Sequence, residues 1–491
     1  MSKSFSMRPT MMAKRSLSGP TPARQGGAAL LLIMLLVMIA AMAVLVTRLN
    51  LNEQRAQLQR EAQDALAIAR QALLDYAAIN PDFSSGYVAR LPCPDIDNSG
   101  GLPEGVAHGD ACGAAGTSVM GRLPWRTLGI APPKDSAQAC LWYVVSGSHK
   151  DATGASAAMT NADSNGQLAL YGVEAGAVIA GQQAEDRAVA MIIAPMQAIG
   201  GQSRAAPGGA GSVCSSSFAA ADFLDVDASS GISNRSLSGA ADGIELLAMA
   251  SGHNAAHNDR ITLLTRSDVA SVLLARNDYD SSMRALGLAV ASCVADYAAS
   301  NPGGSSDRRM PWPAPLSLVD YRSDAAYDDQ NLGALSGRLP DTSNDSNALT
   351  GNSIAQVLSA CNPARVPAWT ADMLSRWQNW KDHFFYAVAE SFAPGAAVPS
   401  VCSSCLTVNG AGQYAAVIIF GNARLNSLAQ RRNAPPADTD TKREPGNYLE
   451  GGNAGRFPYL SGSVDLVSGP ASATFNDRLF CIDSNLAVME C

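Results

Sequence analysis

The heptapeptide DYAAINP at residues 75–81 returns almost unchanged as DYAASNP at residues 296–302. Each copy closes a stretch in which apolar side chains recur at steps of three and four residues, which is typical of an amphipathic helix. Each copy also ends in Asn-Pro, and a proline disfavours a helical conformation of the residue before it. The sequence therefore predicts two related helices that both end at this motif.

Further pairs of short motifs follow the two helices in the same order and at similar spacing. The pairs are LP and PW at 91–92 and 124–125 against MPW at 310–312, AVAMII at 188–193 against YAAVII at 414–419, and HNDRI at 257–261 against FNDRL at 475–479. The shared order and spacing indicate an internal duplication, with one unit at 48–265 and a second at 266–491.

Each unit is predicted to consist of a helix followed by several short strands. Short apolar runs bounded by turn-forming residues are typical of buried strands. The runs lie at 141–146, 188–194, 243–250 and 261–265 in the first unit, and at 384–389, 415–421, 463–467 and 479–482 in the second. Because no strand–helix–strand alternation is present, the predicted fold class is α+β, with an antiparallel sheet in each unit.

Upstream of the first unit, every residue from Ala28 to Val46 is apolar. At about 1.5 Å per helical residue, this run matches the roughly 30 Å hydrocarbon core of a bilayer and predicts a transmembrane helix at 28–47. The segment before it is basic and contains no acidic residue. Positive charge is retained in the cytoplasm, so the main part of the chain is expected outside it. A cleaved secretory signal is the alternative, because AMA at 41–43 fits a small-x-small cleavage site.

The junction RQGGAALL at 24–31 resembles the prepilin-type leader of type IV pilins and type II secretion pseudopilins. The resemblance implies that a prepilin peptidase removes a basic leader at 1–27 by cutting after Gly27, or alternatively after Gly26. Ala28 is then the mature, methylated N terminus. In that family the apolar helix is retained and packs against other pilin or pseudopilin subunits, and it continues as one long transmembrane and amphipathic helix under a globular head.

One departure from the family pattern concerns the fifth mature position. Most members carry glutamate there, whereas this chain has Leu32, or Leu31 with the alternative cut. The family's glutamate helps to recruit and register subunits, so its absence indicates a low-copy or tip subunit rather than a major one. The motifs LPCPDID at 91–97 and GRLPWRTLG at 121–129 are also similar to a group of pilin-like envelope proteins, which implies a pilin-like head.

All ten cysteines lie after the apolar run, and their even number is typical of a disulfide-bonded domain in an oxidising compartment such as the periplasm. The C-x-x-C at 402–405 is predicted to be a structural disulfide, because no second C-x-x-C exists to complete a zinc site. The disulfide candidates are Cys93 with Cys112, Cys402 with Cys405, and Cys481 with Cys491.

Asp95, Asp97 and Ser99 place oxygen ligands at alternate positions before a glycine, as at the beginning of a calcium-binding loop. An EF-hand needs glutamate at its twelfth position, where this chain has valine, and Glu104 or Asp110 is the alternative acid. Some pseudopilins hold calcium in a loop of their own, so the resemblance suggests calcium as the one cofactor. A polar turn held by a disulfide is the competing interpretation.

Other residues with reactive side chains are interpreted as structural. His253 and His257 are four residues apart, but no third ligand is evident near them, so no metal site is predicted there. Asn-Asp-Arg at 258–260 and its second copy each precede a predicted strand, which favours a turn with a local Asp–Arg hydrogen bond. A net charge of −8 argues against nucleic-acid binding. The chain also lacks the common nucleophile, P-loop and zinc-protease motifs.

These observations predict a non-enzymatic minor pilin- or pseudopilin-like subunit of a type IV pilus or type II secretion-type filament. The expected location is the bacterial inner membrane, with a single pass and the head in the periplasm or in a surface filament. The expected partners are the prepilin peptidase and other pilin-like subunits. The alternatives are a membrane-anchored periplasmic binding protein or adhesin that never enters a filament, and a periplasmic hydrolase.

Overall fold

The computed structural model describes most of the chain after the basic leader. The described residues are 26–79, 89–97, 102–109, 112–151, 160–207, 212–251, 254, 256–300, 308–319, 327–329, 333–343, 357–359, 361–394, 396, 401–432 and 440–491. The chain divides into two compact units, Met1–Arg60 and Glu61–Cys491, and both large sheets belong to the second.

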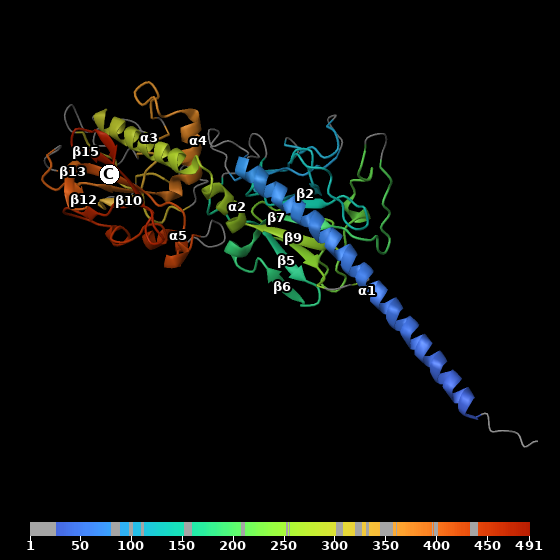
Figure 1. Cartoon of the computed structure of the whole chain (residues 1–491). Coiled ribbons are helices and arrows are strands. Elements are labelled where there is room, and N and C mark those ends of the chain that lie inside the picture. Colours follow the sequence, from blue (N-terminus) through green and yellow to red (C-terminus); the bar gives the residue numbers. More distant parts are fainter. Residues whose placement is uncertain are drawn as a thin grey trace, which may run out of the picture. The chain divides into compact units, whose positions relative to one another are not determined.

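The first element, α1 (Gly26–Ile79), is one continuous helix (Figure 1). No glycine or proline occurs between residues 28 and 79, so nothing in the sequence interrupts its hydrogen-bond ladder. The helix ends at Ile79, directly before Asn80-Pro81, as the motif predicts. Among the residues that the structure describes, no helix combines the length and the apolar character needed to cross a membrane. The transmembrane helix expected at 28–47 therefore stays a prediction.

The first sheet has seven strands, of which four form an antiparallel row in the order β2-β3-β7-β9. β5 pairs antiparallel with β7 and β6, and β8 runs parallel to β5. The strands are β2 (Val119–Arg122), β3 (Trp142–Val145), β5 (Leu168–Gly172), β6 (Ala177–Ala180), β7 (Ala188–Ala194), β8 (Glu245–Met249) and β9 (Arg260–Thr265). A separate parallel pair consists of β1 (Leu91–Pro92) and β4 (Lys150–Asp151).

The second sheet also has seven strands and contains the antiparallel row β10-β11-β13-β15. β12 pairs antiparallel with β13, β14 runs parallel to β12, and β16 pairs with β15. The strands are β10 (Ser336–Arg338), β11 (Phe384–Val388), β12 (Leu406–Val408), β13 (Ala411–Phe420), β14 (Asp465–Leu466), β15 (Arg478–Asp483) and β16 (Val488–Glu490).

Six strands of each sheet therefore share one arrangement, and the seventh differs, since β6 pairs with β5 whereas β16 pairs with β15. In each, a four-stranded antiparallel row carries a side pair whose two strands are parallel, β5 with β8 and β12 with β14. Every stretch that the sequence predicts as a strand overlaps one. The structure corrects the expectation of purely antiparallel sheets. In each sheet one strand, β8 or β14, runs parallel to a strand that does not directly precede it in the chain. The chain is accordingly a mixed α+β protein with several sheets.

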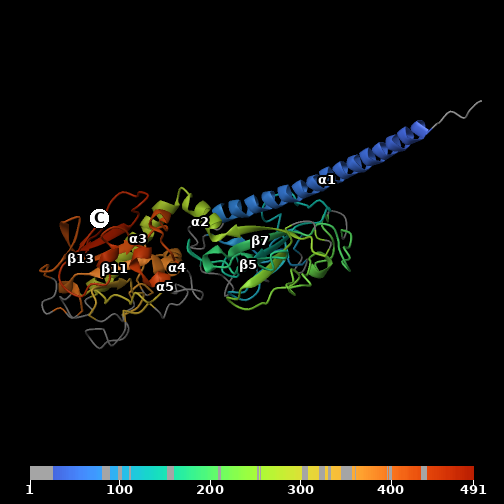
Figure 2. The same ribbon diagram turned by 90° about the horizontal axis from the view of Figure 1, so that it is seen from below.

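Helices connect and cover the second sheet. Thr265 caps α2 with a reciprocal capping box to Asp268, so α2 begins at Arg266, where the sequence places the second unit. α3 lies along the sheet that contains β11 and β13 (Figure 2). The α-helices are α2 (Arg266–Leu274), α3 (Tyr279–Ala299), α4 (Ala371–Trp380) and α5 (Asp440–Arg443). The 3-10 helices in the described part of the chain are η4 (Ala184–Asp186), η5 (Ala220–Asp222), η8 (Lys381–His383), η9 (Glu390–Phe392), η10 (Asn426–Leu428), η11 (Pro445–Asn447) and η12 (Ala454–Arg456).

β7, the central strand of the first sheet, is buried on both faces, which explains why it is apolar throughout. Successive side chains of a strand point to opposite faces. Accordingly, Ala190 and Ile192 join the large core that includes the end of α1, whereas Met191 and Ile193 join a smaller cluster. In the unit Glu61–Cys491, α1 contributes its side chains at steps of three and four, among them Leu73.

Candidate functional site

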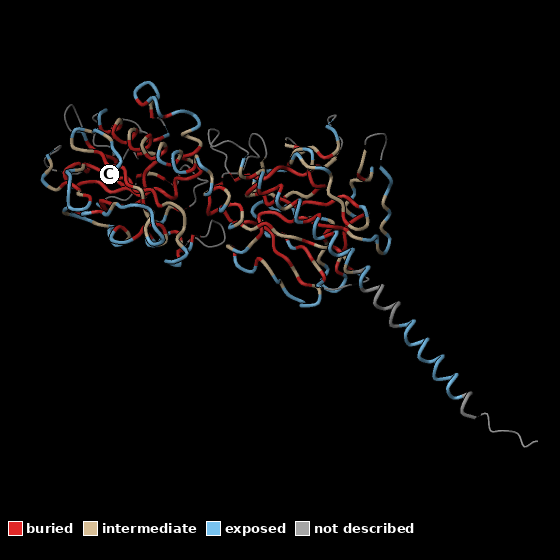
Figure 3. Tube along the Cα trace, viewed as in Figure 1, coloured by how far each residue is buried: buried red, intermediate tan, exposed pale blue. Residues whose placement is uncertain are grey.

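The N-terminal part of α1 is exposed to solvent (Figure 3), and its side chains there are apolar. Its large apolar side chains from Leu30 to Val44 are between 54% (Leu35) and 69% (Leu31) exposed. A side chain of this kind gains about 1.5–3 kcal/mol when it is fully removed from water. Such a surface is therefore suited to contact with lipid or with other apolar helices. Gly26, at the expected cleavage junction, is the first residue of α1, and residues 1–25 lie outside the described part.

The structure contains five disulfides that use all ten cysteines. Three of them are the pairs that the sequence suggests: Cys93–Cys112, Cys402–Cys405 and Cys481–Cys491. The other two, Cys140–Cys214 and Cys293–Cys361, close loops with sequence separations of 74 and 68 residues. Spacing alone could not have revealed these long-range pairs.

In the first sequence unit, a buried carboxylate network fixes the start of β9. Asp225 Oδ2 accepts hydrogen bonds from the backbone N–H groups of Asn258 (2.6 Å) and Asp259 (3.0 Å). Asp259 Oδ2 accepts from the backbone N–H of Asp225 and from Asn234 Nδ2, both at 2.8 Å. Asn234 also pairs with the N–H (2.7 Å) and the C=O (2.9 Å) of Ala248 in β8. The network thereby joins three segments that are distant in sequence.

The second sequence unit repeats this network at the start of β15. Glu450 Oε2 accepts hydrogen bonds from the backbone N–H groups of Asn476 (2.9 Å) and Asp477 (3.0 Å). Asp477 Oδ2 accepts from the backbone N–H of Glu450 (3.0 Å) and from Asn453 Nδ2 (2.9 Å). Asn453 pairs with the N–H and the C=O of Val467, both at 2.8 Å. The two networks match bond for bond.

A glutamine and an arginine two residues after it extend both networks. Gln202 Nε2 donates to the acid of the first network at 2.9 Å, and Gln430 Nε2 donates to the acid of the second at 2.7 Å. Arg204 in turn donates to Gln202 Oε1 at 3.3 Å, and Arg432 donates to Gln430 Oε1 at 3.1 Å. We name the two sets of residues the Asp225 network and the Glu450 network.

One position differs in kind between the two networks. The residue before the Asn-Asp-Arg motif is His257 in the first copy and Phe475 in the second. His257 is only 1% exposed, and its Nδ1 lies 3.8 Å from Asp225 Oδ2. Neither ring nitrogen has a hydrogen-bond partner in the described part of the chain. Among the described residues, His257, Asp225 and Asp259 are the one group of three whose potential metal-ligand atoms lie within 4.8 Å of one another.

The electrostatics of the networks follow from burial. Burial raises the pKa of the Asp259 carboxyl well above its ordinary value, and the nearby charge of Asp225 raises it further. Burial beside Glu450 raises the pKa of Asp477 in the same way. Burial lowers the pKa of His257, so its imidazole is favoured in the neutral form, which is the form that binds metal ions.

The predicted calcium ligands Asp95 and Asp97 occupy different surroundings. Asp95 is buried, and its Oδ2 accepts the backbone N–H of Gly105 at 2.7 Å. Burial raises the pKa of the Asp95 carboxyl to about 6. Asp97 is partly exposed, and its Oδ1 lies 3.8 Å from His108 Nε2. These contacts hold the loop beside the Cys93–Cys112 disulfide.

The other oxygen ligands expected of that loop are only partly described. Ser99 and Asp110 lie outside the described residues. The carboxylate of Glu104 accepts the backbone N–H groups of Val213 (3.0 Å) and Cys214 (2.8 Å). Its oxygens are therefore engaged in a contact between two loops.

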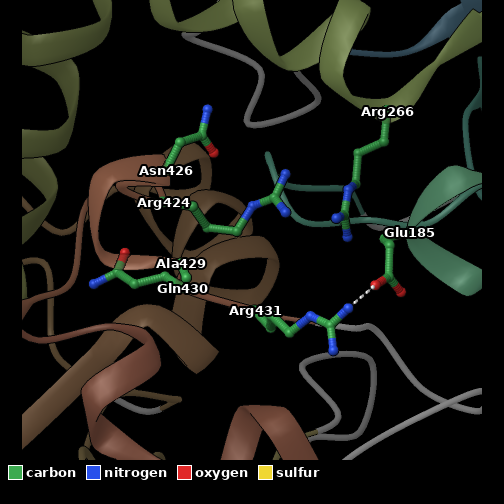
Figure 4. A pocket seen from close by; sticks show the side chains of 7 residues that line it. All are labelled: Glu185, Arg266, Arg424, Asn426, Ala429, Gln430 and Arg431. Carbon is green, nitrogen blue, oxygen red and sulfur yellow. Dashed lines mark hydrogen bonds and ion pairs between the residues drawn. The ribbon is translucent and has the colours of Figure 1, made fainter.

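Three arginines line a pocket of about 230 Å³ (Figure 4). Arg266 comes from the first turn of α2, whereas Arg424 and Arg431 come from the segment after β13. Arg424 Nε pairs with the buried Asp163 at 2.9 Å, and Arg431 pairs with Glu185 at 3.3 Å. Burial and the charge of Arg424 lower the pKa of Arg266 to about 10. Cationic side chains outnumber the acidic ones in this lining, so the pocket is suited to an anionic group.

The sequence pointed to part of these sites. The repeated Asn-Asp-Arg motif marks both networks, although Asp259 bonds to distant residues, where a local Asp–Arg bond was expected. The partner acid could not be found by motif comparison, because it is Asp225 in one copy and Glu450 in the other. His253 lies outside the described residues.

Comparisons with known proteins add no identification. No protein-family model, no curated protein and no solved structure matches the chain. The assignment of function therefore rests on the chain's own residues and contacts.

Proposed function

We propose that the protein is a non-enzymatic, low-copy pilin- or pseudopilin-like subunit, anchored in the bacterial inner membrane by the helix that begins at Ala28. Its sheets are then held in the periplasm or in a surface filament. The observation that carries this proposal is the exposed apolar surface of α1 between Leu30 and Val44. Every residue of the sequence from Ala28 to Val46 is apolar, so no face of this segment is suited to water.

The physical argument concerns what can cover such a helix. Lipid covers it before assembly, and the apolar helices of sister subunits cover it in a filament. The RQGGAALL junction supports processing in front of the helix, so that the apolar run is retained. Leucine at the fifth mature position supports a tip or low-copy subunit.

The cysteines support a location outside the cytoplasm. All ten form disulfides, and stable disulfides are rare where thioredoxin and glutathione keep thiols reduced. The basic leader supports the same orientation, with the N terminus inside and the sheets outside.

Processing can be tested by mass. The full-length chain with a C-terminal tag is expressed with and without a prepilin peptidase, and its intact mass is measured. We expect a product that begins at Ala28 only when the peptidase is present. Gly27→Leu should block the cut and Gly26→Leu should not, whereas the reverse pattern would assign the cut after Gly26. A mass that never begins near Ala28 contradicts the proposal.

Assembly can be tested by photo-crosslinking in cells that make the filament. A photoreactive residue at Leu35, on the apolar surface, should give adducts with other pilin-like subunits. The same residue at Ile179, which is 50% exposed on β6, is the matched control and should give none. Adducts to lipid alone, together with an uncut leader, would contradict incorporation in a filament.

The arginine-lined pocket favours a second candidate, an anchored periplasmic protein that binds an anionic ligand. Calorimetry with phosphate and citrate on the full chain in detergent tests this alternative. Arg424→Gln should weaken binding by about tenfold or more, because it removes a charge-assisted contact worth about 1.5–3 kcal/mol. Unchanged binding in this variant, or no binding by the unaltered chain, rejects the pocket as a ligand site.

A further inference from the structure

His257 is a buried histidine whose ring nitrogens have no hydrogen-bond partner among the described residues. A buried polar group without a partner costs about 1–3 kcal/mol, so such groups are uncommon in proteins and call for an explanation. The ring lies against the Asp225 network, with Nδ1 3.8 Å from Asp225 Oδ2. Asp259 Oδ1, in the same network, also lacks a hydrogen-bond partner in the described part of the chain.

The spacing of these groups fits a shared cation. Zinc bonds of about 2.0–2.2 Å to nitrogen and oxygen place neighbouring tetrahedral ligands roughly 3.4 Å apart. The ligand atoms of Asp225, His257 and Asp259 all lie within 4.8 Å of one another. Small side-chain movements therefore suffice to bring all three onto one ion.

The charges around His257 also favour a cation. The carboxylates of Asp225, Asp227 and Glu174 act on its ring, as does the positive charge of Arg260. Two acids of the network, Asp225 and Asp259, are buried next to each other. The charge of Arg204 offsets part of their repulsion, and a shared proton or a bound cation would offset the rest.

We propose that Asp225, His257 and Asp259 bind one divalent transition-metal ion, with zinc as the best-fitting example. An imidazole nitrogen with two carboxylates suits zinc and related first-row ions, whereas calcium prefers oxygen ligands alone. The ion joins the loop before β9 to the segment around Asp225, so its role is structural. The site is separate from the sequence-predicted calcium loop.

The second unit explains why the site is specific to one copy. Phe475 stands where the first copy has His257, and the Glu450 network keeps all its corresponding hydrogen bonds. The hydrogen bonds of the carboxylates are therefore sufficient to hold the segments of a network together without a histidine. In the Asp225 network, His257 is the additional residue that makes a metal site possible.

The test uses the full-length chain in detergent with its disulfides intact, stripped of metal by a chelator. Zinc is then added, and binding is followed by calorimetry and by the metal content after dialysis. We expect one tightly bound zinc per chain. Loss of an outer contact to a metal ligand already costs 10–100-fold in affinity, so His257→Phe should weaken zinc binding by about 100-fold or more.

His257→Phe rebuilds the arrangement of the second copy, so this variant is expected to fold. Its thermal unfolding without metal, measured beside that of the parent, checks this point. His108→Gln is the matched control, because His108 is also buried and also lies 3.8 Å from an aspartate. This variant should bind zinc like the parent.

Three results would overturn the proposal. They are no zinc on the folded parent chain, unchanged zinc binding by His257→Phe, and loss of zinc in His108→Gln alone. If His257→Phe fails to fold, Asp225→Asn provides the second variant and should also lose zinc. Cobalt substitution gives an independent readout, since its visible spectrum reports the ligands and should change in both variants. None of these measurements depends on leader cleavage or on filament assembly.

Discussion

The Asp225 and Glu450 networks have the same hydrogen bonds but not the same composition. In both, an acid accepts hydrogen bonds from the two backbone N–H groups directly before β9 or β15. In both, an asparagine also bonds to the backbone of a side-strand residue or its neighbour, Ala248 in β8 or Val467 after β14. The acid changes from aspartate to glutamate without loss of a bond, whereas the adjacent residue changes from His257 to Phe475. The common part therefore explains folding, and the difference indicates where a function has been added.

The largest expected effect concerns stability, and it tests whether the two networks contribute equally to the free energy of unfolding. Asn234→Ala and Asn453→Ala each leave a backbone N–H and a C=O without their partner, and each removes one of the two hydrogen bonds to an aspartate oxygen. At about 1–3 kcal/mol for each group, either variant should lose about 3 kcal/mol or more of unfolding free energy. Urea titration of both variants measures the loss. Asn254→Ala, which removes an exposed local turn contact, is the control. A large loss of unfolding free energy in only one of the two variants would show that the two networks do not contribute equally to stability.

The second prediction concerns a variant in which the Glu450 network receives the histidine of the Asp225 network. Phe475→His places an imidazole beside Glu450 and Asp477, and the variant should bind a second zinc ion. At a zinc concentration about 100 times the dissociation constant, a site adds about 2.7 kcal/mol of stability. Zinc content and unfolding with and without zinc measure both consequences. A stoichiometry that stays at one would mean that carboxylate geometry, in addition to the histidine, separates the two copies.

The smallest effect is the pH dependence of stability. The pKa of Asp477 is raised on folding, so the folded state holds a proton that the unfolded state releases. The carboxyl therefore favours folding more as the pH falls from its folded pKa toward the ordinary aspartate value. Each unit of pKa difference corresponds to about 1.4 kcal/mol. Urea titrations across this pH window should show the increase in unfolding free energy as the pH falls. Asp477→Asn should remove the part of this increase that comes from the Asp477 carboxyl.

The pKa of Asp259 is raised for the same reasons as that of Asp477, so Asp259 should show the same pH dependence in the metal-free protein. In the zinc-loaded protein, protons compete with the ion, so acid should reduce rather than increase the stability of this corner. An identical pH profile with and without zinc would contradict the assignment of Asp259 as a ligand.

Much of the fold could be predicted from local patterns. The run AVAMIIA coincides with β7 because both faces of that strand are buried, so the apolar run has no polar interruption. The end of α1 follows from Asn80-Pro81. The parallel pairs could not be predicted, since β8 reaches β5 across a long connection that leaves no periodic signal.

The candidate site was harder to predict than the fold. His257 stands out in the sequence, but no pattern near it indicates Asp225, which lies 34 residues before Asp259. The arginine-lined pocket draws on α2 and on the segment after β13, which no motif connects. Contacts between distant segments depend on topology, and the sequence constrains topology only weakly.

The central claim is that the apolar helix is kept after processing and holds the protein in the membrane and its assembly. The most direct test is the N-terminal sequence and intact mass of the protein isolated from native membranes. We predict a mature chain that begins at Ala28 and is extracted only by detergent. A soluble periplasmic product that begins after Ala43 would contradict the account.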